Sequence, residues 1–148
     1  MTKDIILKIV GHQFEVEDSE PIEVITTAEY YEKNGKHYII YNEVISEDGA
    51  ENRNTIKFNE QRVDLIKHGA QEGRMVFELD QKNICSYNTP FGDIILGIST
   101  MEIISNISED EIQLEISYAL EVNDVHMSNC KIKINAFSKE SQKFQLQL

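Results

Sequence analysis

The sequence predicts an all-β protein, a single antiparallel up-and-down β-barrel of eight to ten strands. Three observations predict this fold. Apolar and polar residues alternate with a period of two along most of the chain, turn-forming residues separate the alternating runs, and no long run carries a helical period without competing alternation. Closure into a barrel follows because a meander with few long connections otherwise leaves exposed edge strands. A two-sheet sandwich is the alternative.

The alternation is clearest in residues 111–122, EIQLEISYALEV, where every second residue from Ile112 to Val122 is apolar. Such a run is typical of a strand with one buried face. The same period recurs in GRMVFELD and HMSNCKIKINAF. In chain order, the expected strands are residues 4–14, 22–32, 37–46, 53–59, 62–68, 74–80, 83–89, 93–105, 111–122 and 126–137.

Turn residues separate these runs at the spacing of antiparallel hairpins. Asn34-Gly35 is the strongest signal, because a two-residue hairpin turn needs positive φ at both central positions. Gly97, inside an apolar run, permits a bulge there. In the segment 89–92, TPFG, Pro90 fixes φ and the final glycine can take positive φ. This corner is interpreted as a device that fixes strand register, and a role for Phe91 at a ligand-binding mouth is the alternative.

Length and charge limit the function classes. A chain of 148 residues is expected to form one domain, residues 1–148. With 26 acidic against 14 basic residues, the net charge is −12, and no basic patch offsets it, so nucleic acid and anionic membranes are unfavourable partners. No segment has the length of a membrane span. Cys85 and Cys130 are widely separated in apolar patterns and are expected to be buried free thiols, which favours a cytoplasmic location.

The motifs of common enzyme classes are missing. The sequence contains no phosphate-binding glycine loop, HExxH, GxSxG or EF-hand loop. The four histidines are scattered singly, and acidic residues cluster where turns are expected. No catalytic residue, metal site or cofactor is therefore predicted, and a binding protein is favoured over an enzyme.

The tyrosines are the strongest candidates for a binding role. All six lie within predicted strands. A tyrosine that points into a barrel offers an apolar ring and a hydroxyl that can orient a ligand, and the alternative is that these rings simply pack the core. Tyr118 is expected to point inward with Ile116 and Leu120. The candidate cavity-lining residues are Tyr41, Met75, Tyr87, Phe91 and Tyr118.

Several segments resemble the YwiB-like family of uncharacterised bacterial proteins, a domain of unknown function. The similar features are the Gly69-Ala70 pair, Phe77, the corner Tyr87, Thr89, Pro90, Phe91 and Gly92, the hairpin TTAEYYEKNGKHYIIYNE, and the segments EISYALEVND and HMSNCKIKI. The resemblance covers nearly the whole chain in order. It implies a calycin-like, lipocalin-type barrel in the bacterial cytoplasm, and it supplies no activity.

Two functional hypotheses follow. The leading one is a non-enzymatic module that holds a small, largely apolar ligand inside the barrel. The alternative is a protein-interaction module that uses the acidic surface or an exposed sheet edge, with a filled barrel interior.

Overall fold

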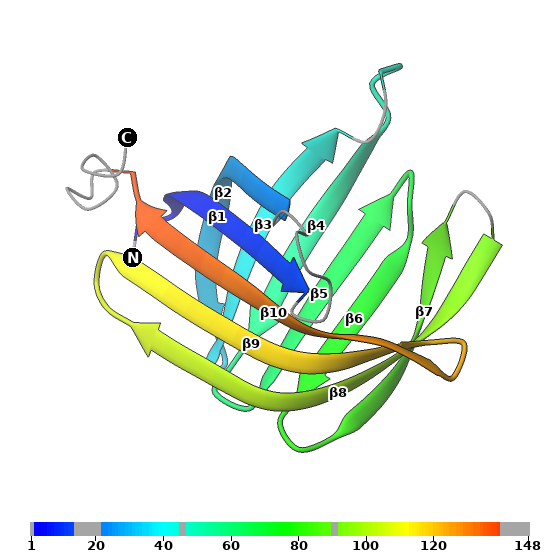
Figure 1. Cartoon of the computed structure of the whole chain (residues 1–148). Coiled ribbons are helices and arrows are strands. Elements are labelled where there is room, and N and C mark those ends of the chain that lie inside the picture. The colour runs from blue at the N-terminus through cyan, green and yellow to red at the C-terminus, as the bar shows by residue number, and fades with distance from the viewer. Residues whose placement is uncertain (1, 14–21, 45–46, 90–91, 140–148) are drawn as a thin grey trace.

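The computed structural model describes residues 2–13, 22–44, 47–89 and 92–139. These residues form ten antiparallel strands in a closed barrel (Figure 1). Each strand pairs with its neighbours in sequence, and β1 also pairs with β10 to close the ring. The predicted all-β up-and-down barrel is thus confirmed, and the sandwich alternative is wrong. The described residues include no helix with the length and apolar character needed to cross a membrane.

All ten predicted strands are present, with boundaries within two residues of the prediction wherever the chain is described. The strands are β1 (Asp4–Gln13), β2 (Ile22–Lys33), β3 (Lys36–Val44), β4 (Glu51–Phe58), β5 (Arg62–Gly69), β6 (Gly73–Glu78), β7 (Lys82–Thr89), β8 (Gly92–Ile107), β9 (Glu111–Val122) and β10 (Val125–Ser138).

The alternating residues of the sequence place one face of each strand inside the barrel. In β9, Ile112, Leu114 and Ile116 are at most 2% exposed, and they form part of one continuous core. In β8, the register with β9 shifts between Thr100 and Glu102. This shift moves the inward positions by one residue, which explains why the sequence of β8 is apolar on both faces. The bulge lies there and not at Gly97, where the sequence permitted one.

The turn prediction at Asn34-Gly35 is confirmed by positive φ at both residues, 54° and 75°. Gly92, at the start of β8, also has a positive φ of 110°. Pro90 and Phe91 lie outside the described residues, so the register role of this corner stays a prediction.

Two seams in the barrel wall are weakly paired. The ladder between β2 and β3 runs only from Lys33↔Lys36 to Glu29↔Ile40, so the rest of β2 pairs with no described residue of β3. Between β6 and β7, the described residues pair only at Gly73↔Tyr87. Strands that diverge in this way leave room beside the barrel interior, and both seams border the site described below.

Candidate functional site

A cavity of about 110 Å³ lies inside the barrel, and we call it the interior cavity. Tyr41, Met75 and Tyr87, three of the five candidate residues, line it together. They come from β3 and from the consecutive strands β6 and β7, which β4 and β5 separate from β3 along the chain. The aliphatic part of the wall is formed by Ile9, Ile56, Leu65, Ile132 and Ile134.

A polar cluster of Glu43, Asn54 and Lys67 stands at one end of this cavity. Asn54 Nδ2 donates a hydrogen bond of 3.1 Å to Glu43 Oε1, and Lys67 Nζ lies 3.4 Å from the same oxygen. The Lys67 ammonium also lies 5.9 Å from the centre of the Tyr87 ring, within cation–π range. The cavity therefore has aliphatic walls and one end that can form hydrogen bonds.

Asn54 has hydrogen-bonding capacity left over. It is 3% exposed and lines the cavity, and its Oδ1 has no hydrogen-bond partner among the described residues. A buried amide oxygen without a partner costs about 1–3 kcal/mol, so native structures usually supply one. A residue of the cavity wall therefore carries a buried acceptor that no described group satisfies.

The ionisation of two cavity residues depends on their neighbours. Burial raises the pKa of Tyr41, and the nearby Glu43 carboxylate adds to this, while Asn54 and Lys67 oppose it. Burial alone lowers the pKa of Lys67, but contacts with Tyr87 and Glu43 outweigh it, and the net pKa is raised. At neutral pH Tyr41 is therefore an uncharged phenol and Lys67 a cation.

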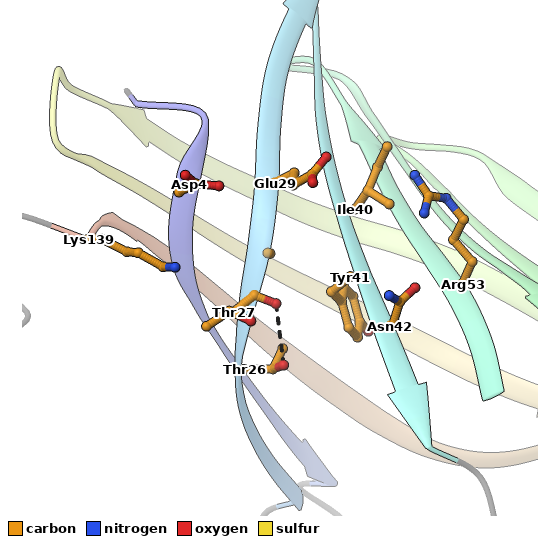
Figure 2. A pocket seen from close by; sticks show the side chains of 10 residues that line it. Asp4, Thr26, Thr27, Glu29, Ile40, Tyr41, Asn42, Arg53 and Lys139 are labelled. Carbon is orange, nitrogen blue, oxygen red and sulfur yellow. Dashed lines mark hydrogen bonds between the residues drawn. The ribbon is translucent and has the colours of Figure 1, made fainter. Parts of the chain in front are cut away.

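A second pocket, of about 230 Å³, lies at the seam where β2 and β3 diverge, and we call it the side opening. Its lining includes Thr26 and Thr27 on β2, and Asn42 and Arg53 beyond the gap. Figure 2 shows the Tyr41 ring between the ribbons of β2 and β3. Because Tyr41 lines both pockets, its side chain stands between the interior cavity and the outside.

Stacked aromatic rings lie toward the opposite end of the barrel. Along β3, His37 lies at the other end from Glu43. The His37 ring stacks on Phe58 with centroids 4.9 Å apart, and its Nδ1 is within 2.6 Å of the Tyr30 hydroxyl. None of these three rings lines the interior cavity, whose wall includes Asn54 and Lys67 of the polar cluster.

The other two candidate residues are placed differently. Tyr118 points inward, as the alternation predicted, and it is 6% exposed. It does not line the interior cavity but packs edge-on against Phe77, with centroids 4.8 Å apart. Burial first, and then the neighbouring Cys130, raise the pKa of Tyr118, which keeps it neutral. Phe91 lies outside the described residues.

Sequence reasoning missed the polar cluster, although the signal is present. In β4, ENRNTIKF, Asn54 alternates in phase with the buried Ile56 and Phe58. In β5, Lys67 is in phase with Val63 and Leu65. A polar residue that occupies an inward position of an alternating strand indicates an interior polar site, and this test would have found both side chains.

No cluster of metal-binding side chains is found in the described part of the chain. There, no three His, Cys, Asp or Glu side chains lie close enough to hold a metal ion. Cys85 and Cys130 are both buried and free, as predicted.

The fold and the site define a closed ten-stranded β-barrel protein with an apolar cavity and a polar cluster at one end. The chain belongs to the family described as a domain of unknown function (DUF1934), which it matches over residues 7–134. It is similar to the "Uncharacterized beta-barrel protein YwiB" of Bacillus subtilis, with 31% identity over 117 residues that cover 78% of this chain and 81% of that protein. It also resembles the crystal structure of the ywiB protein from Bacillus subtilis, with a TM-score of 0.68, 27% identity and 91% of both chains covered.

Proposed function

We propose that the chain is a non-enzymatic binding protein that holds a small, largely apolar ligand in the interior cavity. The observation that carries the proposal is that the buried Asn54, whose Oδ1 has no partner among the described residues, belongs to the wall of a cavity with aliphatic sides. An apolar cavity alone would not carry it, because imperfect packing of a protein core also leaves such cavities. A buried acceptor without a partner in the cavity wall is costly unless a ligand or water satisfies it.

The volume limits the size of the ligand. The interior cavity measures about 110 Å³, and a dry cavity of about 150 Å³ is enough to bind benzene. Because the interior cavity is smaller than that, the apolar part of the ligand is at most one ring, or a short aliphatic chain. A larger ligand requires Tyr41 to rotate out of the space that it shares with the side opening.

The polar cluster limits the head group. Asn54 Oδ1 requires a donor, and the Lys67 ammonium and the Tyr41 hydroxyl can donate to an acceptor. A hydroxyl group meets both requirements, because it donates one hydrogen bond and accepts others. We infer that the ligand carries a hydroxyl or a similar small head next to its ring or chain.

Phenol and benzene form a matched pair of probes. Both are expected to bind in ligand-detected NMR titrations, with phenol up to about tenfold tighter because its hydroxyl donates to Asn54. Asn54→Leu keeps the side-chain shape and is expected to abolish that preference. Asn106→Leu, at an exposed position of β8, is the control and should keep it.

A second pair of variants tests the cavity itself. Ile132→Phe adds volume inside the interior cavity and is expected to abolish binding of both probes. Ile104→Phe makes the same change on β8 at a side chain that is 42% exposed, and it should leave binding intact. Equal binding of phenol by the parent and by Ile132→Phe would refute the proposed site.

The protein-interaction alternative rests on the net charge of −12. It becomes the favoured function if neither probe binds and a basic partner is recovered from the host lysate at low salt but not at high salt. In either case we propose a cytoplasmic location, because two buried free thiols persist most easily in a reducing compartment.

A further inference from the structure

An acidic side chain is buried on the outer face of the barrel. In β5, Val63 and Leu65 point inward, so Asp64 points outward, yet its side chain is only 5% exposed. Directly across the neighbouring strands lie Lys57 of β4 and Val76 of β6. An outward carboxylate that is this well covered needs charged partners, since burial of an unpaired charge is costly.

Two arginines supply that cover. Arg62 Nε donates to Asp64 Oδ1 at 2.7 Å, and Arg62 Nη2 donates to Oδ2 at 3.3 Å. Arg74 Nη2, from β6, donates to the same Oδ2. Burial alone raises the pKa of Asp64, but the hydrogen bonds from Arg62 and Arg74 outweigh it, so the pKa is lowered and the carboxylate stays charged at neutral pH.

One carboxylate does not neutralise two guanidiniums. The two arginines, with Lys36 and Lys57, line a pocket of about 280 Å³ over Asp64, which we call the outer cationic pocket. Its lining thus carries four cations and one anion, an excess of three positive charges, within a chain whose net charge is −12. Glu78, which pairs opposite Arg62, is near but does not line the pocket.

The arginines are also held in place. Each guanidinium has five N–H donors, and Asp64 accepts from two nitrogen atoms of Arg62 and one of Arg74. Donors therefore remain on both forks, and the buried carboxylate fixes the direction in which they point. Fixed guanidinium forks match the geometry of phosphate and carboxylate oxygens, and they lose little side-chain entropy on binding.

We propose that the outer cationic pocket is a binding site for a phosphate group. A phosphomonoester carries a charge of about −2, which largely offsets the local excess, and its three oxygens can accept from both arginines and a lysine at once. A pocket of about 280 Å³ holds such a group with part of the molecule that bears it. This site is on the outside of the barrel and does not depend on a ligand in the interior cavity.

The test is a calorimetric titration with inorganic phosphate and pyrophosphate, with succinate as a dicarboxylate, at constant low ionic strength. Saturable binding of one pyrophosphate per chain is expected. Lys57→Gln should weaken it about tenfold, because one charge-assisted hydrogen bond is lost. Lys57 makes no hydrogen bond to Asp64 in the described structure, so this variant leaves the carboxylate and its arginines in place.

Lys133→Gln is the matched control. It removes the same charge at an exposed position of β10, away from the pocket, and should leave pyrophosphate binding within twofold. Arg74→Gln is expected to weaken binding at least as much as Lys57→Gln, and its melting curve shows whether the variant is folded. The proposal is overturned by lack of saturation with either phosphate, by equal losses in Lys57→Gln and Lys133→Gln, or by binding of succinate alone.

Discussion

The two halves of the barrel wall differ in how tightly their strands are paired (Figure 1). From β8 through β9 and β10 to β1, the ladders are long, and that between β9 and β10 runs from Val122↔Val125 to Glu111↔Phe137. From β2 to β7, the wall includes both weak seams, with one described pair between β6 and β7. We call these the tight half and the loose half.

The two halves contribute different chemistry to the interior cavity. The tight half supplies only aliphatic side chains: Ile9, Ile132 and Ile134. The loose half supplies Tyr41, Asn54, Lys67, Met75 and Tyr87, and also the outer cationic pocket. Tyr41 and Tyr87 lie beside the two weak seams, where diverging strands leave space. Asn54, Lys67 and the outer cationic pocket lie on β3 to β6 of the same half, between the two seams. The tight half therefore holds the fold, and the loose half carries both proposed sites.

The largest expected effect is the loss of stability when a core side chain is truncated, and this loss should differ between the two halves. Ile116, in β9 of the tight half, is fully buried, so Ile116→Ala should lower the free energy of unfolding by about 2–5 kcal/mol. Leu65, in β5, already borders the interior cavity, and Leu65→Ala should cost about half as much. Urea denaturation followed by tyrosine fluorescence measures both, since the chain has no tryptophan. Equal losses would contradict the division into halves.

The next effect concerns how β6 is held. Because β7 forms little pairing with β6, the ion pair between Asp64 of β5 and Arg74 of β6 is important for holding β6 in the sheet. Asp64→Asn should therefore lower the free energy of unfolding by about 2 kcal/mol at neutral pH. The folded-state pKa of Asp64 is lowered from 3.8, so its contribution is present above that pH and is lost as the pH falls through the folded-state value. The difference between parent and variant should therefore shrink in acid. A difference that does not change with pH would show that the charge is not the cause.

A smaller effect is expected at the one paired position of the weak seam. A Cβ on Gly73 would lie 2.8 Å from Tyr87 Cδ2, so Gly73→Ala should displace the Tyr87 ring and cost about 1–2 kcal/mol. Gly11 has no atom within 4 Å of the equivalent position, and Gly11→Ala is the control, expected to be neutral. Binding of phenol should weaken in Gly73→Ala but not in Gly11→Ala. This result would show that packing at the seam between β6 and β7 affects the interior cavity.

Much of the tight half could be predicted from the sequence. In β9, strict alternation from Ile112 to Val122 determined both the strand and its inward face. The turn at Asn34-Gly35 followed equally directly from its need for positive φ. Local patterns of this kind act through the backbone of a few neighbouring residues, so they can be recognised without knowledge of the remaining chain.

The site could be predicted only in part. Tyr41, Met75 and Tyr87 were chosen by residue type, and the structure brings them together because β3, β6 and β7 face one space. Where the barrel is hollow, however, depends on the sum of side-chain volumes from all ten strands. That sum left Tyr118 packed on Phe77 and away from the cavity, although its inward orientation was foreseen. The weak seams depend in the same way on register around the whole ring.

The last prediction compares the two halves without any substitution. Amide hydrogens of β6 and β7 that face their shared seam should exchange with solvent much faster than those of β9, because local opening there breaks few backbone hydrogen bonds. At one end of the seam Asn88 N donates to Glu72 O, and at the other end the chain turns from β6 into β7, where Asp80 N donates to Thr100 O of β8. Exchange should be fastest between these points. Residue-resolved exchange by NMR measures this directly. Equal protection of Ile84, whose amide faces the seam, and Ile116 would mean that the seam is as stable as the tight half. Weak pairing would then not explain where the polar site lies.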